Sequence, residues 1–493
     1  MIRMPKGTGR RILTPQETSA FAHDADAYPM PSEVMGMPPV AERLYHGYEA
    51  IDVVPPELYE KYDVKRGLRN ADGSGVLVGL TTISNVHGYN KTEHGVEPDE
   101  GDLIYRGIPV GQLIDGSQAE GRFGYEEVAY LLITGSLPTK EELADFQARI
   151  DSRRQLPEGY LGIFPRTTFN HSIMNVLQRA TLLLYAFDPN GDDTSPTHEI
   201  DVAISLLGRW PRAAAVAHAA KVAADNDKRL VVPPAREGYS MAETVLDVLR
   251  SDEGFTHEEA MLLDVMLMLH AEHGGGNNST FATRVLSSSA TDPYSAYAAA
   301  IGSLKGPRHG GANAKVVAMH KDIREHVARW EDDDEVAAYL AKLLRREAFD
   351  GSGLIYGMGH AVYTLSDPRA VICKEHARAI AEAKGVGEEF ALIERVERLA
   401  PQVMRDVRGT TKPICANIDL YTGFIYGMLG VPETLFTPLF AVARTAGWAA
   451  HRMEELFCAH RIIRPAYRSV TERQEYVPLE ERGDGEEFAP DAD

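Results

Sequence analysis

The sequence is poor in cysteine, with only Cys373, Cys415 and Cys458 among 493 residues. No C-x-x-C pair occurs, and an odd number of widely spaced thiols provides no disulfide framework. Chains that do without structural disulfides are typical of the reducing cytosol. We therefore expect a cytoplasmic protein.

Long apolar runs are also lacking. The best candidate, from Leu420 to Pro432, ends at Glu433 and is too short to cross a bilayer. The basic N-terminal residues are not followed by the apolar region of a secretory signal. Pro5 and Gly7 disfavour the amphipathic helix that a transit peptide would need. We expect no membrane association.

Positive charge is scarce relative to negative charge. The 51 Lys and Arg residues face 72 Asp and Glu residues, which gives a formal net charge of −21. Such a surface repels nucleic acid and anionic membranes. An anionic substrate would therefore need cations placed locally, so the position of each arginine carries more information than the total charge.

Strand-forming stretches are few, whereas the helix formers Ala, Leu, Glu and Arg are abundant, so we expect a mainly α protein. A chain of this length exceeds one ordinary hydrophobic core, so two or more domains are expected. The two short β-type runs are Val76 to Ser84 and Asp102 to Gly107. Because glycines bound them, they predict a small hairpin near the N-terminus.

Three patterns predict individual helices. Thr139-Lys-Glu-Glu142 is a capping box that should open one helix. The segment Met261 to Leu269 is apolar almost all round, which predicts a helix buried on every side that stops before Gly274. Acids at 331–335 and the pair Arg345-Arg346 would open and close a third helix, in the sense that suits the helix dipole.

Three histidines stand beside glycines. His273 precedes a run of three glycines, His309 lies in Gly-Pro-Arg-His-Gly-Gly-Ala-Asn, and His360 ends Tyr-Gly-Met-Gly-His. Glycine allows sharp turns and close approach of a ligand, so an imidazole held there can face a substrate. Any one of them could instead be packed at a helix end, but three in one stretch of the chain favour a functional site.

His270, Glu272 and His273 also raise the question of a metal site. Two imidazoles three residues apart could share a helix face. A zinc site usually shows a fuller ligand set, however, and the glutamate is not placed as in His-Glu-x-x-His. We expect no metal.

Asp419 lies between apolar neighbours, where a carboxylate is costly to bury unless it is satisfied or used. The alternative is a helix N-cap, because Leu420 onward has a helical pattern. Several arginines in apolar or small-residue surroundings could clamp carboxylates bidentately. They are Arg369, Arg444 and Arg464, whereas we assign Arg284 to a structural ion pair.

Together these motifs resemble the citrate synthase family. The segment from His270 to Asn313 is similar to the family's signature region, and Gly357-Met-Gly-His-Ala-Val-Tyr-Thr-Leu-Ser-Asp-Pro-Arg369 resembles its Gly-aromatic-Gly-His and Asp-Pro-Arg motif. Met358 replaces the usual aromatic residue, and we expect it to be tolerated because Met fills similar apolar space. The similarity runs from near Gly67 to near Pro465.

The resemblance implies an acyltransferase that condenses acetyl-CoA with oxaloacetate and water to give citrate and CoA. His309 would hydrogen-bond the thioester carbonyl, and Asp419 would remove a methyl proton. His360 would polarise and protonate the ketone of oxaloacetate. The reaction needs no metal or redox cofactor, and acetyl-CoA counts as a substrate and not as a cofactor.

The resemblance also implies the binding residues. The oxaloacetate carboxylates would be bound by His273, Arg369 and Arg444, and by Arg464 from the other subunit of a homodimer with shared active sites. The CoA adenine would lie against one loop. That loop consists of Leu354, Ile355, Tyr356, Gly357, Met358 and Gly359.

The implied layout has two domains that close over the substrates. A large helical domain would comprise residues 67–310 and 420–479, and a small domain residues 311–419. Residues 1–66 would be an N-terminal extension, and residues 480–493 an acidic disordered tail. The extension does not match the regulatory domain of the NADH-inhibited hexamers in the family, so we expect a dimer.

Three alternatives stay open. A 2-methylcitrate synthase uses propionyl-CoA in the same fold, and one methylene is worth only about 1–3 kcal/mol in a pocket. A metallohydrolase built on His270, Glu272 and His273 would contain metal. A non-catalytic relative could bind CoA as a regulator, although the complete set of two catalytic histidines and one aspartate argues against it.

Overall fold

The computed structural model describes residues 54–70, 74–93, 95–157, 159–164, 172–307, 309–410 and 412–482. The chain forms two units, of which the first joins the residues up to Val76 with those from Ala466 onward. Within this unit, the Arg468 guanidinium lies 4.3 Å from the centre of the Tyr62 ring. Its described elements are α3 (Pro56–Lys61), η3 (Arg66–Leu68) and η8 (Leu479–Glu481).

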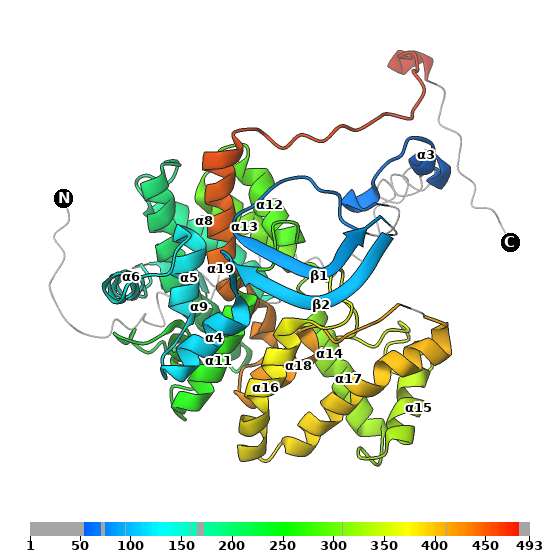
Figure 1. Cartoon of the computed structure of the whole chain (residues 1–493). Coiled ribbons are helices and arrows are strands. Elements are labelled where there is room, and N and C mark those ends of the chain that lie inside the picture. The colour runs from blue at the N-terminus through cyan, green and yellow to red at the C-terminus, as the bar shows by residue number, and fades with distance from the viewer. Residues whose placement is uncertain are drawn as a thin grey trace. The chain divides into compact units, whose positions relative to one another are not determined.

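The second unit, Leu77–Pro465, is mainly helical, which confirms the predicted class (Figure 1). In the part of the chain that is described, no helix has both the length and the hydrophobicity that crossing a bilayer requires. Its α-helices are α4 (Val110–Ala119), α5 (Tyr125–Thr134), α6 (Lys140–Ser152), α8 (Ile173–Leu184), α9 (Pro196–Asp225), α10 (Met241–Leu249), α11 (His257–His270), α12 (Asn278–Ser287), α13 (Pro293–Leu304), α14 (Ala312–His326), α15 (Asp333–Leu344), α16 (Pro368–Ala383), α17 (Gly387–Arg408), α18 (Asp419–Met428) and α19 (Phe436–Glu454).

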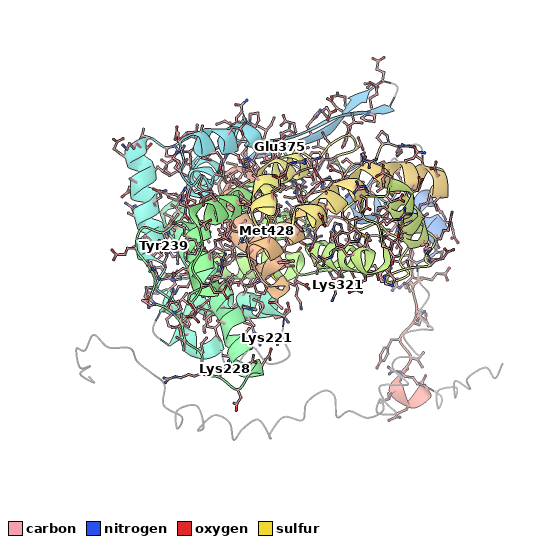
Figure 2. The ribbon with its side chains drawn as sticks, turned by 90° about the horizontal axis from the view of Figure 1, so that it is seen from below. Lys221, Lys228, Tyr239, Lys321, Glu375 and Met428 are labelled. Carbon is pink, nitrogen blue, oxygen red and sulfur yellow. The ribbon has the colours of Figure 1, made fainter. Side chains whose placement is uncertain are left out.

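Helix α19 runs through the centre of the larger group of helices. It packs against α5, α8, α9, α11, α12 and α13, and nearly every residue from Pro438 to Arg452 is buried. A second group consists of α14 to α18, in which α15 packs on α17 and α18 packs on α14 and α16. In Figure 1 the larger group lies on the left of the view and the second group lies at the lower right. Met428, the last residue of α18, lies where the groups meet (Figure 2).

The predicted hairpin exists, and the predicted run Asp102 to Gly107 overlaps its second strand, but the first predicted strand is misplaced. It pairs β1 (Ser84–Thr92) with β2 (Gly95–Tyr105), and β3 (Ile108–Pro109) continues the sheet. The apolar run that predicted the first strand contributes only its last residue to β1. In that run Leu77 is 84% exposed and Leu80 is 88% exposed, so these apolar side chains do not form a buried strand face.

The three helix predictions are confirmed. The hydroxyl of Thr139 accepts the backbone N–H of Glu142 at the start of α6, and the Glu142 carboxylate accepts the N–H of Thr139. From Glu259 to its C-terminal end, α11 is buried on all sides. The side chain of Asp332 caps α15, which ends next to Arg345.

Candidate active site

The predicted CoA loop is fastened to the start of α18 by backbone hydrogen bonds. The Gly359 N–H donates to the Cys415 carbonyl at 2.8 Å, and the Asn417 N–H donates to the Gly357 carbonyl at 2.8 Å. Gly357 has φ +85°, and a Cβ there would lie 2.9 Å from the Cα of Leu420. Only glycine fits this position, so the loop that ends in His360 is held against the helix that begins at Asp419.

Backbone contacts fix the tautomer of His360. Its Nδ1 accepts the N–H groups of Val362 at 3.1 Å and Tyr363 at 3.2 Å. Because Nδ1 must then carry a lone pair, the neutral ring bears its proton on Nε2. Burial, assisted by the nearby Arg369 cation, lowers the pKa of His360 to about 4. His360 is therefore a neutral hydrogen-bond donor near pH 7.

His273 lies next to His360. The two ring centres are 5.2 Å apart and the rings are perpendicular. Burial and the Arg369 cation hold the pKa of His273 well below its usual value. Its Nε2 is buried and has no hydrogen-bond partner among the described residues, so the atom is available to a ligand.

Two buried arginines accompany these imidazoles. Asp367 accepts hydrogen bonds from Nε and Nη2 of Arg369 at 3.0 and 2.8 Å, and this pairing raises the pKa of Arg369 although burial opposes it. Arg444, on α19, donates from Nε to the His270 carbonyl at 2.7 Å. Its Nη2 is buried without a partner among the described residues. Burial lowers the pKa of Arg444 to about 10, so it remains a cation.

His309 is held by the first turn of α12. The Ser279 N–H donates to Nε2 at 3.2 Å, and the Ser279 hydroxyl lies 2.9 Å from the same atom. The neutral ring therefore carries its proton on Nδ1. Burial, with a contribution from the Arg444 cation, lowers the pKa of His309 to about 4. The structure thus places a second neutral imidazole with one N–H to donate.

Asp419 is the first residue of α18, and it does not cap that helix. The alternative that its carboxylate serves as the N-cap is wrong, because the Asn417 side chain accepts the Asp419 N–H at 3.0 Å. Burial raises the pKa of Asp419 to about 6, against the opposing influence of Arg369. No hydrogen bond joins Asp419 to His309 within the described part of the chain, so their action on one acetyl group stays a prediction.

The remaining predicted residues differ in exposure, since the CoA loop contains the buried residues Ile355 and Gly357. In the CoA loop Leu354 is 48% exposed, and the Tyr356 hydroxyl donates to Asp350 at 2.8 Å. The ammonium of Lys315 lies 5.9 Å from the Tyr356 ring centre. Arg464 is exposed in the extended segment that follows α19 and the short helix η7 (Glu455–Ala459), so this chain does not bury it with the other predicted ligands.

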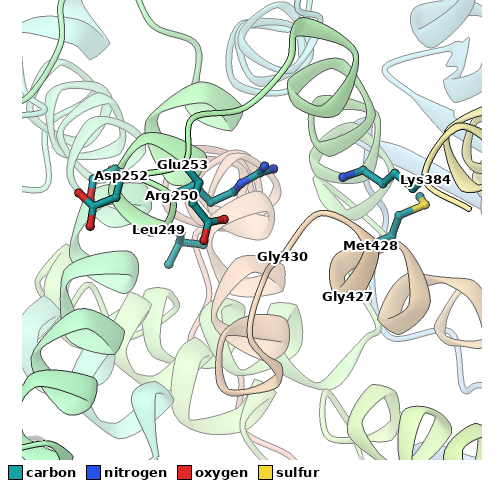
Figure 3. A pocket seen from close by; sticks show the side chains of 9 residues that line it. Leu249, Arg250, Asp252, Glu253, Lys384, Gly427, Met428 and Gly430 are labelled. Atoms are coloured by element: carbon teal, nitrogen blue, oxygen red, sulfur yellow. The ribbon is translucent and has the colours of Figure 1, made fainter. Parts of the chain in front are cut away.

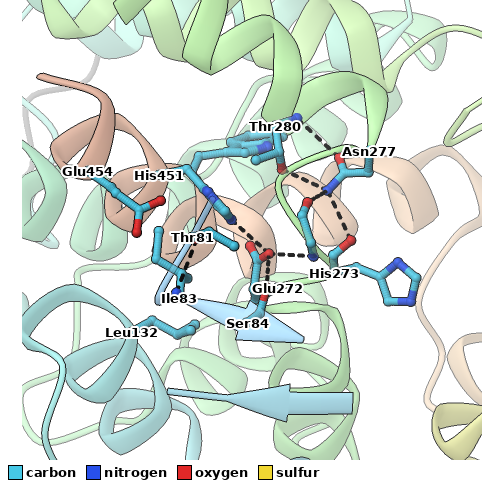
Figure 4. A network of polar contacts seen from close by, with 12 residues as sticks. Thr81, Ile83, Ser84, Leu132, Glu272, His273, Asn277, Thr280, His451 and Glu454 are labelled. Carbon is cyan, nitrogen blue, oxygen red and sulfur yellow. Dashed lines mark hydrogen bonds and ion pairs between the residues drawn. The ribbon is translucent and has the colours of Figure 1, made fainter. Parts of the chain in front are cut away.

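Glu272 belongs to a buried polar network. Its Oε1 accepts hydrogen bonds from the Ser84 hydroxyl and from Nε2 of His451, both at 2.9 Å. Although burial opposes its charge, His451 and Arg444 hold the pKa of Glu272 at about 2. Figure 4 shows the His273 ring pointing away from this network.

His270, the other residue of the metal alternative, donates from Nδ1 to the Met266 carbonyl at 2.7 Å. Among the described residues, no three His, Cys, Asp or Glu side chains are grouped so that they could hold a metal ion. The assignment of Arg284 to an ion pair is confirmed, because it pairs with Glu454 and Glu455.

A cavity of about 460 Å³ lies at the C-terminal end of α18, at the opposite end from Asp419 (Figure 3). Arg250 and Lys384 extend into it from different groups of helices, and both bind Oε1 of Glu259, at 2.9 and 2.5 Å. None of the predicted site residues lines this cavity. Met428 and Gly430 form part of its wall.

Three residues of the site escaped prediction. Ser279 orients His309, Asp367 pairs with Arg369, and Tyr363 contacts both His360 and His273. Two of them lie inside the Gly-Met-Gly-His to Asp-Pro-Arg stretch, which could have drawn attention to them. For Ser279 the sequence held no signal, because its role depends on a contact with a residue thirty positions later.

Comparisons with known proteins show the family of this chain. The sequence model described as "Citrate synthase, C-terminal domain" matches residues 71–466. The chain belongs to the citrate synthase family. The citrate synthase of Deinococcus radiodurans is 32% identical over 388 residues, which cover 78% of this chain and 94% of that protein. The 2-methylcitrate synthase 1 of Corynebacterium glutamicum is 33% identical over 424 residues, covering 85% of this chain and 98% of that protein.

A solved structure of the family has the same fold. The citrate synthase of Thermoplasma acidophilum, in a ternary complex with carboxymethyl coenzyme A and oxaloacetate, matches with a TM-score of 0.69 and 26% identity. The match covers 85% of this chain and 99% of that one. The mainly helical fold of this chain is therefore shared with a solved citrate synthase.

Proposed function

We propose that this member of the citrate synthase family is a citrate synthase, an acyltransferase that joins the acetyl group of acetyl-CoA to oxaloacetate. The observation that carries the proposal is the state of two imidazoles. One ring nitrogen of His309 and one of His360 each accept backbone N–H groups, so each neutral ring presents its remaining N–H. Two fixed neutral donors suit a reaction in which negative charge develops on two carbonyl oxygens.

In the first step, the Asp419 carboxylate removes a proton from the methyl group of acetyl-CoA. A thioester methyl is a weak carbon acid, so a base alone would form an unstable enolate. The Nδ1–H of His309 donates a hydrogen bond to the thioester oxygen as charge develops there. A base whose pKa is raised to about 6 is ionised at pH 7 and still has appreciable proton affinity.

In the second step, the nucleophilic carbon attacks the ketone carbon of oxaloacetate. The Nε2–H of His360 donates to the ketone oxygen and protonates the alkoxide, which gives citryl-CoA. Water then cleaves the thioester and releases citrate and CoA. The free Nε2 of His273 and Nη2 of Arg444, together with Arg369, are the groups that bind the oxaloacetate carboxylates.

The proposal includes a homodimer. Arg464 is exposed, whereas Arg369 and Arg444 are buried, which suits a ligand donated to a second subunit. We infer a cytoplasmic enzyme that uses no metal or redox cofactor. The CoA adenine would lie against residues 354–359. The Thermoplasma acidophilum relative, which was solved with oxaloacetate and a CoA derivative, supports these two ligand classes.

The second candidate is a 2-methylcitrate synthase that uses propionyl-CoA. Relatives with this name are as similar to the chain as those named citrate synthase, which favours keeping it. The same three catalytic residues serve both reactions. The pocket need only discriminate one methylene, worth about 10- to 200-fold in kcat/KM.

A thiol-release assay tests the proposal. The purified chain should release CoA from acetyl-CoA only when oxaloacetate is present, and citrate should appear in equal amount. A kcat/KM at least tenfold higher for propionyl-CoA would replace citrate synthase by 2-methylcitrate synthase. Release that ignores oxaloacetate, or no release with either thioester, would refute both.

A further inference from the structure

We propose that Tyr363 is a positioning residue, held by the β1–β2 hairpin, that fixes the imidazoles of the oxaloacetate site. The inference rests on the function proposed above and goes beyond it, because it assigns a role to a residue outside the catalytic and binding set. It also gives the small sheet a part in the activity.

The Tyr363 ring contacts three of the proposed oxaloacetate-site residues. It stacks on His360 with ring centres 4.7 Å apart and an angle of 25°. It meets the edge of His273 at 5.6 Å and 70°. The Arg369 guanidinium lies 5.7 Å from the same ring centre. One flat side chain thus sets the mutual orientation of two imidazoles that are themselves 5.2 Å apart.

The backbone of Tyr363 acts on the same histidine. Its N–H donates to Nδ1 of His360 at 3.2 Å, so the residue fixes both the plane of that ring and the position of its proton. A shift of Tyr363 would therefore change the direction in which Nε2–H points. Displacements of about 1 Å in a reacting group can lower rates about 10²-fold.

The hairpin packs against Tyr363 through two glycines. A Cβ on Gly88 would lie 3.0 Å from the Cα of Tyr363, and a Cβ on Gly101 would lie 2.9 Å from its Cδ1. The Tyr363 hydroxyl also points to the hairpin and lies 3.5 Å from the Asp102 carbonyl. Any side chain at these two positions would collide with the segment that carries Tyr363. Glycine has none, so the hairpin can lie directly on that segment.

Ser366 joins the same two segments. The Gly101 N–H donates to the Ser366 hydroxyl at 3.1 Å, and that hydroxyl donates to the Glu100 carboxylate. A Cβ at Gly101 would also lie 2.1 Å from the Ser366 carbonyl oxygen. The hairpin is therefore attached on the C-terminal side of Tyr363 as well as over its ring.

Tyr363 does not take part in proton transfer in this arrangement. Burial raises the pKa of its hydroxyl far above the usual value of a tyrosine, and the hydroxyl is directed at the Asp102 carbonyl and away from the imidazoles. Its contribution comes from the flat face of the ring. Phenylalanine should supply that face, whereas leucine should not.

The first test compares Tyr363→Leu with Tyr363→Phe. Tyr363→Leu is expected to lower kcat/KM for oxaloacetate by about 10²-fold, while KM for acetyl-CoA changes less than about threefold. The kcat/KM of Tyr363→Phe for oxaloacetate should stay within about threefold of the wild-type value. The matched control is Tyr160→Leu, because Tyr160 is also buried, contacts two aromatic rings and donates its hydroxyl to a backbone carbonyl, that of Ala180 at 2.9 Å.

Tyr160→Leu should lower the melting temperature without changing either KM. If Tyr363→Leu lowers only the melting temperature, as the control does, then Tyr363 is a packing residue and the proposal is wrong. The proposal is also wrong if Tyr363→Phe loses as much kcat/KM as Tyr363→Leu, because the hydroxyl would then carry the effect.

The second test acts through the hairpin and remains available if Tyr363→Leu does not fold. Gly101→Ala should lower kcat/KM for oxaloacetate at least tenfold. Gly116→Ala is the control, because a Cβ at Gly116 on α4 meets no atom within 4 Å. Equal activity of the two glycine variants would overturn the role of the hairpin.

Measurements on the wild-type protein distinguish a failure of the proposed function from a failure of the proposed role of Tyr363. If it neither binds oxaloacetate in calorimetry nor releases thiol, the proposed function fails regardless of Tyr363. If it does both and the variants behave like their controls, the proposed function stands and only the role of Tyr363 fails.

Discussion

The side chain of Asn417 accepts the backbone N–H of Asp419 at 3.0 Å. Asn417 thereby accepts one of the free backbone N–H groups at the start of α18, which is the role of an N-capping side chain. Its Nδ2 donates to the Gly359 carbonyl at 2.8 Å, so the same amide is tied to the loop before His360. Among the described residues, no hydrogen bond or ion pair to the Asp419 carboxylate occurs, which suits a group that removes a proton.

Asp419→Ala should lower kcat by about 10²- to 10⁴-fold, because general-base catalysis contributes a factor of that size. The loss should appear in thiol release with saturating acetyl-CoA and oxaloacetate. Glu325→Ala, which removes an exposed carboxylate on α14, is the matched control and should retain full activity. Near-normal turnover of purified Asp419→Ala would remove this residue from the mechanism.

The pH profile should report the raised pKa of Asp419. Because burial raises that pKa to about 6, the ionised base becomes scarce below pH 6. We expect kcat/KM for acetyl-CoA to fall about fivefold between pH 6 and pH 5, and to approach a tenfold loss per pH unit below pH 5. His309 and His360, with pKa values of about 4, remain neutral over this range. A profile that stays flat down to pH 4.5 would contradict the assignment.

The same shift should appear in stability. A carboxyl group whose pKa is raised on folding binds its proton more tightly in the folded state, so its ionisation lowers the free energy of unfolding as pH rises from about 4 to about 6. Asp419→Asn removes this effect. It should raise the free energy of unfolding by about 1–3 kcal/mol at pH 7.5 and have little effect at pH 4. Denaturant unfolding at both pH values measures the difference, with Glu325→Gln as the control. If Asp419→Asn is less stable than the wild-type protein at pH 7.5, the prediction is wrong.

Mixed subunits can test whether Arg464 acts across a dimer. Arg464→Ala and Arg369→Ala should each raise KM for oxaloacetate strongly, since each removes a carboxylate ligand. If one site uses Arg369 of one subunit and Arg464 of the other, a mixed dimer contains one site with both arginines. Co-expression and refolding of the two variants should therefore restore part of the activity. Complete absence of recovery in a verified mixed dimer would show that the sites are not shared.

The local parts of the fold could be predicted from sequence. The capping box at Thr139 and the apolar stretch of α11 determine their helices through contacts within a few residues. The hairpin shows the limit, because the apolar run Val76 to Ser84 predicts a strand. Leu77 and Leu80 in that run are exposed, and the polar segment Ser84–Thr92 pairs instead. Whether a segment forms a strand depends on the segment with which it pairs, and a short stretch of sequence does not contain that partner.

The candidate site divides in the same way. The neighbouring glycines identified His273, His309 and His360 as candidates, because the local backbone requires glycine there. Ser279, which fixes the tautomer of His309, lies thirty residues away in the sequence. The N–H groups that fix His360 come from Val362 and Tyr363, which are close in sequence. The domain boundaries and the roles of Arg464 and the CoA loop remain predictions, since they concern ligands and a second subunit.

The pairing between residues 357–359 and 415–417 has a further consequence. The segment proposed to recognise the nucleotide end of the thioester and the helix that carries the proposed base form one continuous piece of hydrogen-bonded backbone. Docking of the distant adenosine would thus help to aim the carboxylate at the methyl group. A shortened thioester without adenosine should consequently react more slowly even at saturation, in addition to binding more weakly.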